Sequence, residues 1–162
     1  MIELLVIGLG SPFGDDRIGW DVVQLLQQRR ALTAYTENQL QFACYDRPGL
    51  NLLELIQNAK SVFLIDAVRT GAEIGTLVCL KEDEINVINT IGTTHHFGVA
   101  EAIQMGKVLN LLPQNLILYG IEIDELNFQF EVSKLLKKAL QALIEQIEKN
   151  IITHMNSLKS TS

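Results

Sequence analysis

Three groups of side chains along the chain could bind a metal ion or move a proton. The first is the pair Asp15-Asp16 after a glycine-rich turn, the second is Asp66 near the end of an apolar run, and the third is the pair His95-His96. Carboxylate oxygens and a neutral imidazole nitrogen together suit a divalent transition ion such as zinc or nickel, whereas a typical magnesium site has fewer nitrogen ligands. The residue types therefore indicate a site for such an ion, provided that the fold brings them together.

The first pair of acids follows a turn that should connect a strand to a helix. Residues 3–7 form an apolar run that is too short for anything but a buried strand, and Ile18 and Val22 begin an apolar pattern at helical spacing. Aspartate at a helix start usually accepts hydrogen bonds from the free amides of the first turn. Two consecutive acids cannot both be that cap, so we expect one of Asp15 and Asp16 to cap the helix and the other to remain for chemistry.

Asp66 ends the clearest strand pattern in the chain. Residues 61–67 form an almost continuous apolar run, which is typical of a parallel sheet that is covered on both faces. Because a buried aspartate is costly unless it is paired or hydrogen-bonded, we expect Asp66 at the carboxyl end of the strand, where open α/β sheets bind ligands. A purely structural Asp66 that accepts hydrogen bonds from loop amides is the alternative.

The histidine pair precedes a predicted helix. Thr93 and Thr94 are suitable caps for that helix, which would put His95 and His96 in its first turn. The positive end of a helix favours neutral imidazole over its cation, and the neutral form is the one that binds metal. In an open sheet of this kind, the loops that carry Asp16, Asp66 and the histidines would meet along one edge.

The remaining pattern alternates between strands and helices. Further strands are expected at residues 39–45, 75–80 and 115–121, with residues 85–91 extending the sheet edge, and helices at about 18–30, at 52–58, from the histidine pair onward and at 130–152. This alternation predicts an α/β fold, a three-layer α/β/α sandwich with a mostly parallel, doubly wound sheet. We expect a single domain over residues 1–152, followed by a polar C-terminal tail at 153–162 that frays.

Composition excludes several classes of partner. The 162 residues carry a formal net charge of -6 without a run of Lys and Arg, which disfavours nucleic acid and anionic membranes. The first apolar run lacks the basic residues of a signal peptide, and no stretch has the roughly 18 apolar residues of a membrane span. Cys44 and Cys79 lack paired spacing, so we expect buried thiols in a reducing cytoplasm, and we expect a monomer.

Two other chemistries fit the sequence poorly. In the glycine-rich turn, the third glycine comes one residue late for a dinucleotide-binding fingerprint, Pro12 lacks an amide, and the acids that follow would repel phosphate. There is no Gly-x-Ser-x-Gly elbow, and neither cysteine lies beside a histidine in the sequence. We therefore expect no nucleotide cofactor, although a Rossmann-like nucleotide-binding domain stays as a less favoured alternative, and no serine or cysteine hydrolase.

Three motifs together resemble the hydrogenase maturation endopeptidases, which remove a C-terminal extension from the large subunit of nickel-iron hydrogenases. They are Gly8-Leu9-Gly10-Ser11-Pro12-Phe13-Gly14-Asp15-Asp16-Arg17-Ile18-Gly19, then Ile65-Asp66-Ala67, then His95-His96-Phe97-Gly98, and they occur in the family's order. The chain departs from the family pattern at Ser11, which replaces an asparagine, at residues 46–49, which replace a glycine-rich segment, and after Glu122, where Ile123 replaces a proline.

The resemblance implies both a reaction and a set of site residues. It implies that Asp16, Asp66 and His95 contact nickel that is already inserted in the hydrogenase large-subunit precursor, so that the nickel belongs to the substrate, and that the same three residues form the catalytic site. His96 takes a variable position. A bound divalent ion can polarise a carbonyl or activate water, and either would promote peptide hydrolysis. A non-catalytic, nickel-sensing chaperone of the same precursor is the alternative.

Overall fold

The described part of the chain forms one five-stranded sheet. The computed structural model describes residues 1–12, 14–87, 98–123 and 134–160. The strands are β1 (Ile2–Gly10), β2 (Leu40–Asp46), β3 (Ala59–Val68), β4 (Leu77–Lys81) and β5 (Asn115–Glu122). Their order across the sheet is β2-β1-β3-β5-β4, and every neighbouring pair is parallel except β4 with β5. The prediction of a mostly parallel sheet is confirmed.

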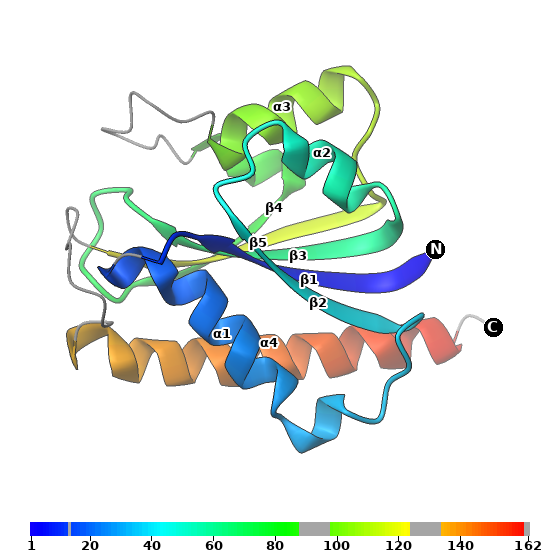
Figure 1. The fold of residues 1–162 in the computed structure, drawn as a ribbon, viewed down its shortest axis with the longest axis horizontal. Coiled ribbons are helices and arrows are strands. Elements are labelled where there is room, and N and C mark those ends of the chain that lie inside the picture. The colour runs from blue at the N-terminus through cyan, green and yellow to red at the C-terminus, as the bar shows by residue number, and fades with distance from the viewer. Residues whose placement is uncertain (13, 88–97, 124–133, 161–162) are drawn as a thin grey trace.

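Helices cover both faces of this sheet, as Figure 1 shows. One face packs against α1 (Ile18–Gln27) and the long α4 (Lys134–Ser160), and the other against α2 (Asn51–Ile56) and α3 (Val99–Val108). Short 3-10 helices, η1 (Gly14–Arg17), η2 (Arg30–Leu32) and η3 (Glu82–Val87), connect these elements. The three-layer α/β/α sandwich is therefore confirmed. None of the helices in the described ranges is long and apolar enough to cross a membrane.

Two apolar cores lie on the two faces of the sheet. Alternate residues of a strand point to opposite faces, so Leu4 and Val6 of β1 enter the core beneath α1 and α4, whereas Leu5 and Ile7 enter the core beneath α2 and α3. All four side chains are buried. Strands that are apolar on both sides are what the continuous runs in the sequence predict, and this burial holds the strand ends in place.

Glycines allow α1 to rest directly on the backbone of the sheet. A Cβ on Gly19 would overlap the carbonyl oxygens of Leu9 and Ile65, and a Cβ on Gly10, whose φ is +154°, would overlap the carbonyl oxygen of Asp16. Only residues without side chains permit this close approach. The glycine-rich turn thus presses η1 and the start of α1 against the ends of β1 and β3.

Replacing Gly19 by alanine is expected to destabilise the protein by about 3 kcal/mol, because backbone atoms of two strands must move to admit the methyl group. Urea denaturation followed by circular dichroism would measure the change. Gln24→Ala, at an exposed position of the same helix, is the matched control and should change stability by less than about 0.5 kcal/mol. Equal stabilities for the two variants would contradict the close contact.

Two local predictions from the sequence are wrong. Of the edge strand predicted at residues 85–91, residues 85–87 instead belong to η3, and residues 88–91 lie outside the described residues. Cys44 and Cys79 are exposed instead of buried, because they lie on β2 and β4, the two edge strands of the sheet. An apolar cysteine in a strand is buried only where a helix covers its face.

The last helix also extends further than predicted. Instead of ending near Ile152 before a frayed tail, α4 continues to Ser160. Met155 is buried at 4% exposure and packs in the same core as Leu4 and Leu40, so the apolar stripe of the helix continues past residue 152. The residues from 153 to 160 therefore belong to the folded structure. Whether residues 1–152 mark a domain by themselves stays a prediction.

We expect Met155→Ala to lower the free energy of unfolding by about 2–3 kcal/mol, because it leaves a cavity between α4 and the sheet. Asn156→Ala, at the neighbouring exposed position, is the control and should be nearly neutral. Thermal unfolding of the two variants side by side would measure the difference. A neutral Met155→Ala would mean that this end of α4 is frayed in solution.

Candidate functional site

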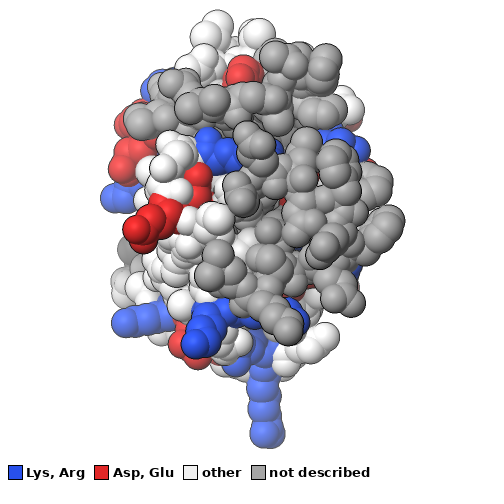
Figure 2. Space-filling view, turned by 90° about the vertical axis from the view of Figure 1, so that its left-hand side faces the viewer, with Lys and Arg blue, Asp and Glu red and all other residues white. Residues whose placement is uncertain are grey.

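The carboxyl ends of the four parallel strands lie at one edge of the sheet, on the left of Figure 1. Asp66 lies near this end of β3, opposite Gly120 of β5, and Asp16 lies in η1, which follows β1. Figure 2 views the molecule from this side and shows acidic and basic side chains next to each other on the described part of the surface. The edge is therefore where the two predicted carboxylates are brought together, as open α/β sheets require.

Asp16 is fixed by the turn that carries it. Its Oδ2 accepts a hydrogen bond of 2.7 Å from the Ser11 hydroxyl, and its main-chain oxygen accepts one of 3.2 Å from the Ser11 amide. Ser11 is 2% exposed, so this pair closes the turn from inside. Asp16 does not cap α1, because the cap position is Arg17 and has no side-chain hydrogen bond, and the side chain of Asp15 is not described. The cap position of α1 is not an aspartate, so the prediction that one of Asp15 and Asp16 caps this helix is wrong.

Asp66 is partly buried and carries a strongly perturbed carboxyl group. Burial is the main cause that raises its pKa from the usual 3.8 to about 7, and the negative charge of Asp16 raises it further. A hydrogen bond from the Ala67 amide and the positive charge of Arg69 oppose this rise. Two carboxyl groups that influence each other in this way share one region of the protein. The pair would bind a divalent cation more readily than either group alone.

The third predicted ligand lies outside the described residues. His95, His96 and the threonines before them fall in the gap between residues 87 and 98, and α3 begins at Val99 with Gly98 as its cap. Among the residues that the structure does describe, no three His, Cys, Asp or Glu side chains gather in a group that could hold a metal ion. The set of Asp16, Asp66 and His95 as catalytic and metal-contacting residues therefore stays a prediction.

Sequence reasoning missed the role of Glu122, which directly follows the strand predicted at residues 115–121. It is the last residue of β5 and is 2% exposed, and its carboxylate accepts hydrogen bonds from the loop that follows β3. The sequence contained a signal for this role, because Glu122 is a single acid at the end of an apolar run, as Asp66 is. A carboxylate at that place in an open sheet should be assigned to the same edge.

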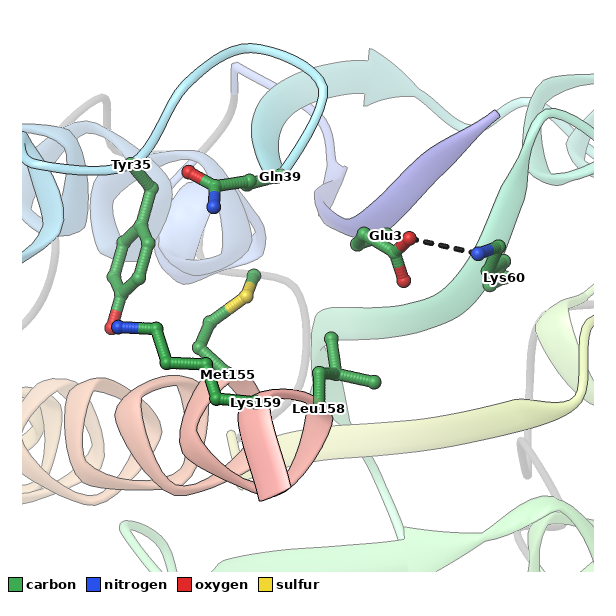
Figure 3. Close-up of a pocket in the computed structure, with 7 residues that line it drawn as sticks. All are labelled: Glu3, Tyr35, Gln39, Lys60, Met155, Leu158 and Lys159. Atoms are coloured by element: carbon green, nitrogen blue, oxygen red, sulfur yellow. Dashed lines mark hydrogen bonds and ion pairs between the residues drawn. The ribbon is translucent and has the colours of Figure 1, made fainter. Parts of the chain in front are cut away.

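A separate hollow lies at the opposite edge of the sheet. It has a volume of about 450 Å³ and is lined by Glu3, Tyr35, Gln39, Lys60, Met155, Leu158 and Lys159. Figure 3 shows that Glu3 and Lys60, which come from the amino ends of β1 and β3, pair with each other on one side of it. Their Nζ–Oε1 distance is 2.8 Å. The hollow is therefore remote from the two carboxylates at the carboxyl ends of the strands.

Curated proteins match this chain in sequence. The chain is 25% identical over 130 residues to the hydrogenase expression/formation protein HupD of Thiocapsa roseopersicina, covering 77% of this chain and 56% of that protein. It thus spans little more than half the length of the curated relatives that it matches.

Solved structures share the fold at lower sequence identity. The hydrogenase maturating endopeptidase HybD from E. coli superposes with a TM-score of 0.76 at 22% identity, over 90% of each chain. The [NiFe] hydrogenase maturation protease HycI from Thermococcus kodakarensis KOD1 superposes with a TM-score of 0.66 at 23% identity, over 92% of each chain.

A family model matches the larger part of the sequence. The match covers residues 47–150, a segment that includes Asp66 and His95 but not Asp16, and the model describes hydrogenase maturation proteases. Because this segment is more than half of the chain, and because the fold agrees, the resemblance inferred from the three motifs is confirmed: the chain belongs to the hydrogenase maturation protease family.

Proposed function

We propose that the protein is an endopeptidase that removes the C-terminal extension of a nickel-iron hydrogenase large-subunit precursor after nickel insertion. The observation that carries this proposal is the interacting pair of Asp16 and Asp66 at the carboxyl edge of the sheet, in a chain of this family. The nickel arrives as part of the substrate and is the feature that the site recognises. The protein acts as a monomer in the cytoplasm and uses no nucleotide.

The chemistry of the pair suits this role. Two carboxylates that repel each other gain most from a dication placed between them, because the ion removes the repulsion as well as the cost of burying charge. His95 supplies a neutral imidazole nitrogen as the third contact. Nickel held in this way can polarise the scissile carbonyl or activate a water molecule for attack on it. A precursor without nickel would lack these contacts and would be left uncut.

The test is to incubate the purified protein with a nickel-loaded precursor and, in parallel, with the same precursor without nickel. Mass spectrometry of the products should show a shortened large subunit only in the nickel-loaded sample. Cleavage of both samples would refute nickel recognition. Binding of the nickel-loaded precursor without any cleavage would refute the endopeptidase and favour the nickel-sensing chaperone.

A further inference from the structure

The carboxylate of Glu122 accepts hydrogen bonds from the loop between β3 and β4 (residues 69–76). Its Oε1 accepts hydrogen bonds from the main-chain amides of Thr70, at 2.7 Å, and Gly71, at 3.0 Å. Its Oε2 accepts one from the Thr70 hydroxyl, at 2.7 Å. Glu122 is 2% exposed while Thr70 and Gly71 are exposed, so a buried acid holds a surface loop from below. Hydrogen bonds to a charged acceptor are stronger than those between neutral groups.

The main chain of Glu122 holds the other end of the same loop. Its carbonyl oxygen accepts a hydrogen bond of 2.8 Å from the Gly75 amide, and its own amide donates one of 2.9 Å to the Thr76 oxygen. Gly71 and Gly75 both have a φ of +89°, a conformation that favours glycine. A single residue at the end of β5 therefore fixes the start and the end of this loop.

Hydrogen bonds to the end of β5 also fix the residues on both sides of Arg69. The carbonyl oxygen of Val68, just before it, accepts a hydrogen bond of 3.0 Å from the Ile123 amide, and the amide of Thr70, just after it, donates to Glu122. Arg69 follows Asp66 by three residues, and its charge acts on the Asp66 carboxyl group. With both neighbours tied to the end of β5, the backbone of Arg69 has little freedom to move relative to the ends of β3 and β5.

We propose that Glu122 is a positioning residue for the cleavage reaction, which it serves by holding Thr70 and thereby fixing the end of β3, the strand that carries Asp66. This inference rests on the proposed endopeptidase function. It assigns Glu122 no contact with the substrate, because the acid is buried beneath the loop. A reacting geometry that shifts by about 1 Å can cost about a hundredfold in rate, so loosening this anchor should slow the reaction itself more than it weakens substrate binding.

Four variants separate the anchor from general stability. Glu122→Ala removes all three acceptor contacts, whereas Glu122→Gln keeps an oxygen for the two amides and a group that can donate to the Thr70 oxygen. Thr70→Val removes only the hydroxyl donor, at an exposed position, and should leave the fold intact. It therefore tests the anchor even if the buried Glu122→Ala variant does not fold. Thr70→Ser keeps the donor and should behave like the wild type.

We expect Glu122→Ala to lower kcat by about tenfold or more, with KM changed less than about threefold, and Thr70→Val to lower kcat by about three- to tenfold. Glu122→Gln and Thr70→Ser should stay within about twofold of the wild type. Asn150→Ala is the stability control, since it loses a hydrogen bond of 2.8 Å to the Tyr119 hydroxyl away from the strand ends, and should leave kcat unchanged. If kcat instead follows stability across all five variants, the positioning role is wrong.

Amide hydrogen exchange of the full-length variants tests the anchor without any substrate. In Thr70→Val and in Glu122→Ala, the amides at positions 70 and 71 should exchange faster than in the wild type, while amides in the middle of β3 should keep their rates. Unchanged exchange at Thr70 and Gly71 in both variants overturns the inference, whatever the activity. A wild-type protein that fails to shorten the nickel-loaded precursor refutes the proposed function instead, and exchange alone then decides whether the anchor exists.

Discussion

Replacing Asp16 by asparagine is expected to lower the rate of precursor processing by about a thousandfold while the protein stays folded. The physical reason is that asparagine keeps the shape of the side chain but removes the negative charge that we propose to contact the nickel of the substrate. The amide oxygen can still accept a hydrogen bond from the Ser11 hydroxyl. The substitution should therefore lower the free energy of unfolding by at most about 1 kcal/mol. Single-turnover cleavage of the nickel-loaded precursor would measure the rate.

Asp83→Asn is the matched control for this change. Asp83 is an exposed acid after the end of β4 that faces the opposite edge of the sheet, where it pairs with Lys107 at 2.9 Å. Both variants change the net charge by the same amount, so a general effect of charge would appear in both. Normal processing by Asp16→Asn, or an equal loss in Asp83→Asn, would remove Asp16 from the proposed site.

Much of the fold could be predicted because it depends on local patterns. The apolar runs that end near Gly8, Tyr45, Ala67 and Ile121 all became strands of one sheet. The runs of β1, β3 and β5 are largely buried on both faces, which leaves few other solutions, whereas β2 is an edge strand. The end of α4 could not be predicted in this way. Residues after Ile152 are mostly polar, and the packing of Met155 and Leu158 against a core of residues distant in the sequence keeps them helical.

The candidate site was predictable in part for the same reason. An acid at the end of a buried strand marks the carboxyl edge, and this rule placed Asp66 correctly. The rule for helix caps failed for the pair Asp15-Asp16. The preference of aspartate for helix starts does not reveal that a 3-10 turn intervenes, or that the Asp16 carboxylate accepts a hydrogen bond from Ser11. The link from Glu122 to Thr70 spans 52 residues, and no local pattern reports such a contact.

Replacing Asp66 by asparagine gives the second large expected effect: stability should rise and activity should fall. Its carboxyl group has a pKa of about 7 in the folded protein, because of burial and the charge of Asp16, against the usual 3.8. Well below pH 3.8 the group is protonated in both the folded and the unfolded chain and costs nothing. As the pH rises, the unfolded chain ionises first, so the folded protein loses stability until the pH has passed the folded-state pKa.

Asparagine at position 66 cannot ionise and so escapes this loss. We expect Asp66→Asn to be more stable than the wild type at about pH 8 by on the order of 2 kcal/mol, and no more stable at about pH 4. Urea denaturation across this pH range would show the wild type losing stability that the variant keeps, whereas Asp83→Asn should follow the wild type. A constant difference between Asp66→Asn and the wild type would mean that the carboxyl group has an ordinary pKa.

The same variant should lose processing of the nickel-loaded precursor by about a thousandfold, because the ionised carboxylate is the form that binds a metal ion. In the wild type, processing should accordingly increase as the pH rises through about 7, over the interval in which the free protein finishes losing stability. The ionised Asp66 carboxylate lowers the stability of the free protein, and only a bound cation offsets this loss. If Asp66→Asn is stabilised and still cleaves, the buried charge serves something other than the nickel of the substrate.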